Sequence, residues 1–260
     1  MTTSEMWYNA QRDKITEYVN ELKDIQNEKY PEKLEELSEL RKFSLETIKN
    51  EGIFYVDKNI ELMLPKYADD LEGFGIISPN NNRPIFQHRW VIPIRDTNGK
   101  VLNLVGYSPV SNERYVYGNS EVYLRRDTLY GLQNLTEAYK CGYAIMCEGI
   151  TDAIALHNIG YRVAFGNCGT FRSTVSINQL ERCRFGVIKI PDRDKAGAIA
   201  NKEWKFSRCI TMKVPLGFKD IDEVLKKEEL REIVKEHIDY CIDYLRENSG
   251  LCDNYMTITY

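Results

Sequence analysis

The stretch that decides the fold is YAIMCEGITD, residues 143–152. Its first half, Tyr143–Cys147, is a short apolar run that ends at the polar turn Glu148-Gly149, and a helical pattern begins at Asp152. A short apolar run followed by a turn and a helix is typical of a buried strand in a βαβ unit.

The same alternation continues to about residue 230. Short apolar strands are predicted again at 162–165, 185–190 and 210–214, and helical stretches at 152–158, 174–183, 196–207 and 222–230. Strands that alternate with helices form right-handed βαβ units around a central sheet. The sequence therefore predicts an α/β fold with a mainly parallel sheet.

Acidic residues follow three of the predicted strands, in the order Glu148, then Asp192 and Asp194, then Asp220 and Asp222. The carboxyl ends of parallel strands lie at the same edge of a sheet, where active sites of such folds gather. Carboxylates held together there repel one another unless cations lie between them. Since carboxylate oxygen is the ligand that Mg²⁺ prefers, the pattern predicts a magnesium site.

A second charged region lies before this sheet. Two β-rich runs, 90–95 and 100–105, flank Asn98-Gly99 and predict a hairpin. Between residues 83 and 126 seven basic residues face three acidic ones, although the whole chain has a net charge of -4. Such a local excess is compatible with a groove that binds phosphates.

The remaining segments complete a four-part prediction. Residues 1–50 are expected to form a helical segment broken near Pro31, and 51–140 a mixed α+β part that includes a turn-rich connection over 73–82. Residues 141–230 form the predicted α/β domain, and 231–260 a C-terminal helical segment.

Composition narrows the class of protein. The chain has 260 residues, 43% of them hydrophobic and 28% charged, which is ordinary for a globular protein. It has no apolar run of membrane-spanning length and no signal-peptide pattern, so we expect a cytoplasmic protein that does not enter a membrane. Seven scattered cysteines without a C-x-x-C favour reduced thiols, and we expect no zinc site.

Three motifs together resemble the TOPRIM domain of topoisomerases and bacterial-type primases: IMCEGITD at 145–152, GNCGT at 166–170 and DRDKAG at 192–197. The narrower resemblance is to the RNA-polymerase core of DnaG-type DNA primases. It rests on RWVIPIRD at 89–96, LYGL at 129–132 and FKDIDEVL at 218–225, and a fainter match around Arg41 and Ser44 extends it to residues 40–230. The resemblance implies an α+β N-terminal subdomain, a Rossmann-like TOPRIM sheet and C-terminal helices.

The resemblance also implies an activity, the synthesis of short RNA primers from NTPs on single-stranded DNA by two-metal nucleotidyl transfer. Glu148, Asp192 and Asp194 would be the catalytic acids and metal ligands, for Mg²⁺ or for Mn²⁺. Asp152, Asp220 and Asp222 would be further ligands or would act through water, although Asp152 fits equally well as an acid at a helix N-terminus.

Basic residues would bind the nucleotide and the template. Arg89, Arg114 and Arg125 align with basic positions of the primase groove, and Lys195 lies in the third TOPRIM motif. Arginine suits phosphate because its planar guanidinium makes paired hydrogen bonds. Each of the three arginines alone could equally be a surface residue.

The chain also departs from the primase pattern. Tyr107 stands where an arginine is usual and is expected either to stack on a base or to pack, and Arg193 replaces a glycine and is expected either near the metal or in solvent. Since the sequence shows neither a zinc module before the core nor a helicase motor after it, we expect a compact primase of a phage or mobile element, working in the host cytoplasm. Its partner would be a replicative helicase or a small DNA-binding accessory protein.

Other functions stay open. A TOPRIM nuclease would use the same metals to activate water, and a noncatalytic nucleic-acid-binding protein could keep the fold. In the plainest alternative the acids merely cap helices of a parallel-sheet domain. A topoisomerase would need a strand-attacking tyrosine in an added domain.

Overall fold

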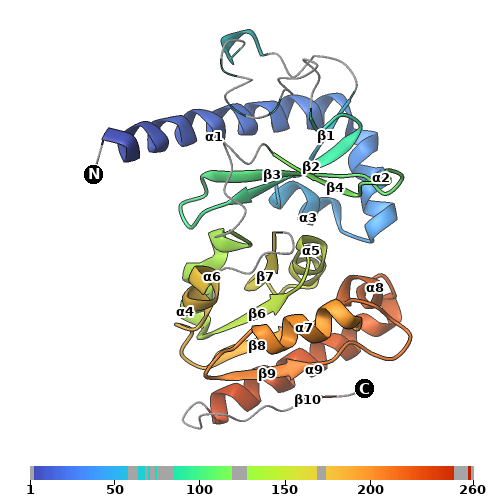
Figure 1. The fold of residues 1–260 in the computed structure, drawn as a ribbon. Helices are drawn as coiled ribbons and strands as arrows, with labels where there is room; N and C mark the ends of the chain where they lie inside the picture. Colours follow the sequence, from blue (N-terminus) through green and yellow to red (C-terminus); the bar gives the residue numbers. More distant parts are fainter. Residues whose placement is uncertain are drawn as a thin grey trace. The chain divides into compact units, whose positions relative to one another are not determined.

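The structure is a computed structural model, and it describes residues 3–57, 64–67, 70, 74, 76, 85–118, 128–168, 174–248 and 257–258. The chain divides into two compact units (Figure 1). The first, here called the N-terminal unit, comprises Met1–Leu40 with Ser44–Arg125. The second, the C-terminal unit, comprises Arg41–Phe43 with Arg126–Tyr260.

The N-terminal unit is a four-stranded antiparallel sheet with helices. Its strands follow the order β1 (Phe54–Val56), β2 (Arg89–Arg95), β3 (Val101–Tyr107) and β4 (Tyr115–Tyr117), and its helical segments are α1 (Thr3–Lys29), α2 (Pro31–Arg41), α3 (Leu45–Asn50) and the 3₁₀ turn η1 (Pro65–Tyr67). Apolar residues of α1 pack on the sheet, where Tyr18 and Leu22 share one buried cluster with Phe54, Val91 and Leu104. The predicted hairpin and the helix break at Pro31 are confirmed.

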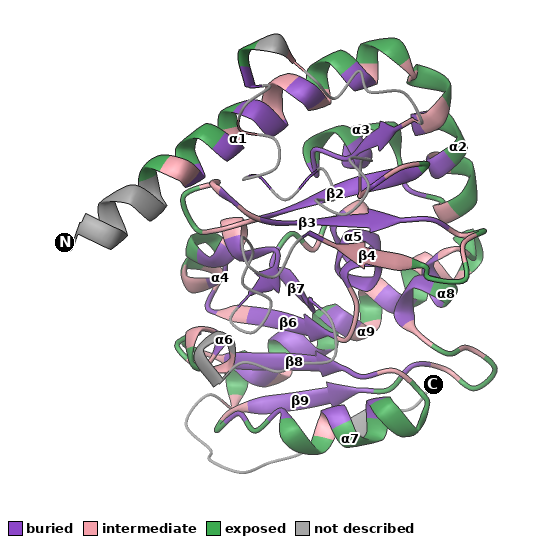
Figure 2. Ribbon diagram, turned by 45° about the horizontal axis from the view of Figure 1, so that its top comes forward, coloured by how far each residue is buried: buried purple, intermediate pink, exposed green. Residues whose placement is uncertain are grey.

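The C-terminal unit has a six-stranded sheet in the order β10-β9-β8-β6-β7-β5. The strands are β5 (Leu129–Tyr130), β6 (Tyr143–Cys147), β7 (Ala164–Asn167), β8 (Gly186–Ile190), β9 (Cys209–Met212) and β10 (Thr257–Ile258), and every pairing is parallel except that of β5 with β7. Figure 2 shows β6, β7, β8 and β9 of this sheet largely buried. The predicted α/β fold with a mainly parallel sheet is confirmed.

Helices connect the parallel strands. They are η2 (Leu132–Asn134), α4 (Leu135–Cys141), α5 (Ile150–Asn158), α6 (Thr174–Leu180), α7 (Lys195–Glu203), α8 (Ile221–Leu225) and α9 (Glu228–Glu247). The predicted helix over 222–230 is wrong in extent, because Lys227 is extended (φ −90°, ψ 108°) and starts a new helix, α9, after α8 has ended. The strand predicted at 162–165 lies at Ala164–Asn167.

Short strands were the features that the sequence did not predict. The unpredicted strands, β1, β4, β5 and β10, have two or three residues each, too few to show a period-two pattern. None of the helices in the described ranges combines the length and the apolar character that a membrane-spanning helix needs. The six cysteines in these ranges are free, and Cys252 lies outside them.

Candidate metal and nucleotide site

The turn after β6 brings Glu148 and Asp192 together. Glu148 Oε1 accepts a hydrogen bond from the Asp192 backbone N–H at 3.1 Å. The approach requires a glycine at position 197, because a Cβ there would lie 2.0 Å from the Asp192 carbonyl oxygen and 2.8 Å from Glu148 Oε1. The Asp-x-Asp-x-Ala-Gly motif therefore fits the first turn of α7 against the Glu148 carboxylate.

Asp192 and Asp194 share one cation. Lys219 Nζ lies 3.6 Å from Asp192 Oδ2 and 3.8 Å from Asp194 Oδ2. Asp194 also caps α7, since its Oδ1 accepts a hydrogen bond from Gly197 N at 2.8 Å. Arg193 is exposed, and its guanidinium donates to the Val214 carbonyl (2.8 Å), so the extra arginine of the motif binds the loop before α8.

The other three predicted acids are held at helix N-termini. Asp152 Oδ2 accepts from Gly149 N (3.0 Å) and its Oδ1 accepts from Asp222 N (3.2 Å), so the carboxylate joins the start of α5 to the start of α8. Asp220 caps α8 through Glu223 N (2.8 Å). Asp222, 3% exposed, pairs with Arg41 (2.8 Å) and Lys226 (2.9 Å).

Burial and mutual repulsion make three of the carboxyl groups, those of Asp152, Asp192 and Asp220, hard to ionise. Burial, and then the charges of Glu148 and Asp220, raise the pKa of Asp192 to about 7, and Lys219 opposes this rise. Burial, followed by the charges of Asp220 and Asp192, raises the pKa of Asp152 well above its usual value. The pKa of Asp220 is raised as well, mainly by burial. A cation bound among them would relieve this repulsion.

A divalent cation fits the chemistry of this donor set. All the candidate ligands are carboxylates, the hard oxygen donors that Mg²⁺ and Mn²⁺ take. In the described ranges, however, no three Asp, Glu, His or Cys side chains already surround one point. Any ion held here would therefore need water or substrate oxygens to complete its coordination, as Mg²⁺ commonly does.

Arg89, one of the predicted phosphate contacts, uses its guanidinium for hydrogen bonds within the protein. It is 9% exposed, and its guanidinium donates to the carbonyls of Glu113 (2.8 Å) and Arg114 (3.3 Å) and to Ser111 Oγ (2.9 Å). Gly106 makes room for it, because a Cβ there would lie 2.9 Å from Arg89 Cδ. Arg89 thus fixes the segment before β4.

Two of the other three predicted basic contacts are exposed. Arg114 and Lys195 have exposed side chains, whereas Arg125 lies outside the described residues. Tyr107 is 6% exposed and stands directly opposite Trp90 and Tyr115 in the sheet, with its ring centroid 5.3 Å from that of Tyr115. Of the two alternatives for Tyr107, the structure shows packing.

Two cations of the site were not singled out from the sequence. Lys219 lies inside the FKDIDEVL motif, but only the fold brings it to Asp192. Arg41 lies 181 residues from its partner Asp222, and its place in the faint N-terminal match was the only signal for it. Both belong with the acids in the C-terminal unit.

Comparison with known proteins agrees with this geometry. A family model described as Toprim-like matches residues 145–225. The DNA primase of Aquifex aeolicus (strain VF5) is 31% identical over 196 residues, which are 68% of this chain and 39% of that protein. A DnaG primase catalytic domain bound to ssDNA has a TM-score of 0.74 at 20% identity, covering 93% of this chain and 83% of that one. The RNA polymerase domain of Mycobacterium tuberculosis primase DnaG also reaches 0.74, at 17% identity, covering 91% and 82%.

The fold and the acidic strand ends thus define a protein with a TOPRIM domain. Within that class, the chain is related to the catalytic core of DnaG-type primases, and the resemblance predicted from the sequence is confirmed. The chain spans between about a quarter and two fifths of the length of the first curated relatives, 27% to 39%. These relatives come from cellular bacteria, which gives no support to a phage or mobile-element origin.

Proposed function

We propose that this chain is a DNA primase catalytic protein that joins ribonucleotides from NTPs into short primers on single-stranded DNA. The observation that carries the proposal is the crowding of Glu148 and Asp192 at the carboxyl ends of β6 and β8, in a Toprim-like domain of a primase relative. Burial and the charges of Glu148 and Asp220 raise the pKa of Asp192 to about 7, and perturbed acids of this kind cluster at functional sites.

Glu148, Asp192 and Asp194 are the proposed metal ligands, and Asp152, Asp220 and Asp222 stay predicted further ligands that would act directly or through water. Two bound Mg²⁺ ions would make the attacking hydroxyl nucleophilic and neutralise phosphate charge. Asp152 holds the Glu148-Gly149 turn through Gly149 N, so it also orients Glu148. Lys219 balances part of the negative charge of Asp192 and Asp194.

Phosphate binding is assigned to the exposed cations. Arg114 and Lys195 have the exposure that contact with a triphosphate or a template needs, and Arg125 stays a predicted contact. Arg89 holds the segment that carries Arg114, and its direct contact with a template stays a prediction. The helicase or accessory partner and the cytoplasmic location also stay predictions.

One assay separates primer synthesis from the two rival functions. Labelled NTP is incubated with single-stranded DNA and Mg²⁺ or Mn²⁺, and a parallel reaction contains labelled DNA and no NTP. We expect short labelled RNA in the first reaction and intact DNA in the second. Cleavage of DNA without NTP would identify a nuclease, and binding without either product would identify a noncatalytic protein.

A further inference from the structure

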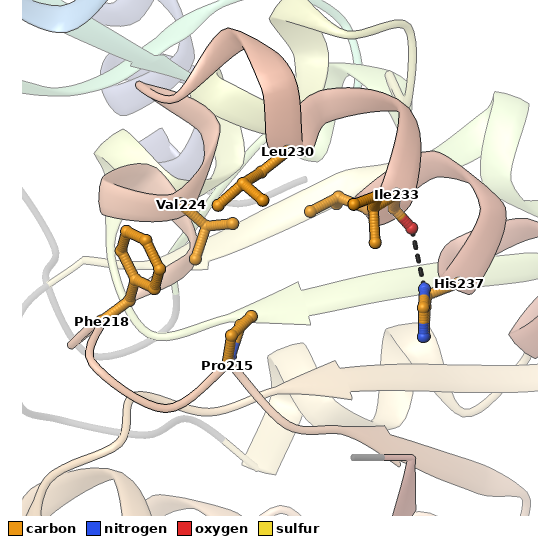
Figure 3. A pocket seen from close by; sticks show the side chains of 7 residues that line it. Pro215, Phe218, Val224, Leu230, Ile233 and His237 are labelled. Atoms are coloured by element: carbon orange, nitrogen blue, oxygen red, sulfur yellow. Dashed lines mark hydrogen bonds between the residues drawn. The ribbon is translucent and has the colours of Figure 1, made fainter. Parts of the chain in front are cut away.

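An apolar groove opens in the C-terminal unit beside the N-terminal half of α9. Its cavity has a volume of about 460 Å³. The wall is formed by Pro215 and Phe218 from the loop before α8, Val224 from α8, and Leu230, Ile233 and His237 from α9 (Figure 3). The only polar side chain among these six is the imidazole of His237, whose Nδ1 donates to the Ile233 carbonyl at 2.8 Å.

The groove continues as an exposed stripe on α9. Ile233 is 40% exposed and Tyr240 is 54% exposed, and with His237 they follow the spacing i, i+4, i+7 of one helix face. The helix packs on the sheet through a different face, formed by Val234, Ile238, Cys241, Ile242 and Leu245. α9 therefore carries more apolar surface than the described residues of its unit cover.

Negative charge runs along the outer side of this stripe. At 3.6 residues per turn, Glu229, Glu236 and Glu247 fall next to Ile233 and Tyr240 on the helix surface. All three glutamates are exposed, and none makes an ion pair within the described part of the chain.

The basic residues of α9 are placed differently. Arg231, Lys235 and Arg246 lie on the other side of the buried face, where each pairs with an acid three residues earlier. The charges on that side are balanced within the helix. The acids beside the groove are not, so a ligand that covers the groove and carries cations beside its apolar face would pair with them.

We propose that this groove binds an amphipathic helix of another protein, with apolar anchors on one face and lysines or arginines beside them. An apolar face in a groove gives such a helix its affinity, and charge complementarity fixes its orientation. Nucleic acid is a poor occupant, because the acid row repels phosphates. A second copy of the chain docked groove to groove would bring two acid rows together. The proposal concerns protein binding and does not depend on primer synthesis.

The test uses the full chain and two displayed libraries of 18-residue helical peptides. Both libraries randomise the apolar positions i, i+3, i+4, i+7 and i+11, and the flanking positions are fixed as lysine in one library and as glutamate in the other. We expect binders from the lysine library and none from the glutamate library. Equal recovery from both libraries would overturn the proposal.

Variants locate the binding. Peptides selected from the lysine library should bind Ile233→Asp at least tenfold more weakly, and Glu236→Lys more weakly with less dependence on salt. Ile25→Asp in α1 is the matched control, since Ile25 is 38% exposed against 40% for Ile233, and it should bind like the wild type.

Folding and self-association are checked alongside. If Ile233→Asp does not fold by circular dichroism, Tyr240→Asp at the more exposed end of the stripe takes its place. Unchanged peptide affinity in a folded stripe variant would overturn the proposal. So would concentration-dependent dimerisation that the same variant abolishes, because a second copy would then be the occupant.

Discussion

The two units of this molecule use their charged residues in opposite ways. In the N-terminal unit, the buried arginines Arg12 and Arg89 are used by the fold, since Arg12 donates to the carbonyls of Val101 and Leu102 and Arg89 to those of Glu113 and Arg114. In the C-terminal unit, carboxylates such as Asp192 are held close to other acids at a cost. Acids that repel one another indicate a functional site better than a count of charged residues does. Charged side chains that are hydrogen-bonded within the fold are typical of a structural role.

The largest expected effect is that of Asp192→Asn on primer synthesis. Loss of a direct metal ligand should lower activity by more than about 100-fold, since even residues behind the ligands often cost 10- to 100-fold. Unfolding at pH 8 without metal should show equal or greater stability, because a repelled charge is removed. Asp24→Asn, at an exposed acid of α1, is the control and should keep full activity. Near-normal synthesis by Asp192→Asn across a metal titration would exclude Asp192 as a ligand.

The acids Glu148, Asp152, Asp192 and Asp220, here called the acidic edge, also predict how stability depends on pH. The pKa of Asp192 is about 7 in the folded protein against a usual 3.8, so the folded state holds the extra proton between these values. The free energy of unfolding in EDTA should therefore fall as pH rises from about 4 to 7, by on the order of 2 kcal/mol more in the wild type than in Asp192→Asn. Urea unfolding of both proteins at pH 4.5, 6 and 8 measures this difference. If the free energy of unfolding of the two proteins changed with pH in parallel, the pKa of Asp192 in the folded protein would not be raised.

Substitutions of Arg89 and Arg114 should change different quantities, protein stability for Arg89 and DNA binding for Arg114. Arg89→Ala removes donors to two carbonyls and should lower stability by about 1–3 kcal/mol. Arg114→Ala should change stability by less than about 0.5 kcal/mol. If Arg114 meets a phosphate, its loss should lower the slope of log affinity for single-stranded DNA against log salt by about 0.7.

Arg89→Lys completes this comparison. It keeps the charge but loses the planar fork, so it should be destabilised like Arg89→Ala while the salt slope stays near that of the wild type. Thermal unfolding and fluorescence anisotropy at several salt concentrations measure the two effects. A reduced slope with unchanged stability in Arg89→Ala would instead put the guanidinium against a phosphate.

The same contrast shows what the sequence could predict. The parallel sheet and the acids at its edge follow from local patterns, because a strand, its turn and its helix are consecutive in the chain. The contacts of Arg89 depend on a segment 22 to 25 residues away and on space left by Gly106. Those of Arg41 depend on a residue 181 positions away. A charge count treats such residues as free, whereas only the fold decides which carbonyl or carboxylate they meet.

The smallest expected effect belongs to Lys219, the cation inside the acidic edge. Its side chain is 56% exposed and its amine lies 3.6 Å from Asp192, so Lys219→Ala should change stability by less than about 1 kcal/mol. At pH 8 Asp192 is ionised and the amine competes with a metal ion, so the variant should bind Mg²⁺ about two- to fivefold more tightly.

At pH 6 this gain should shrink or reverse. Lys219 lowers the pKa of Asp192, so its removal lets a proton compete better with the metal. Calorimetric Mg²⁺ titrations at both pH values measure the change, and Lys213→Ala, at an exposed lysine just before the same loop, is the control that should show none. Weaker Mg²⁺ binding by Lys219→Ala at pH 8 would mean that Lys219 orders the carboxylates. In that case the acidic edge, like the arginines of the N-terminal unit, would use its cation for structure.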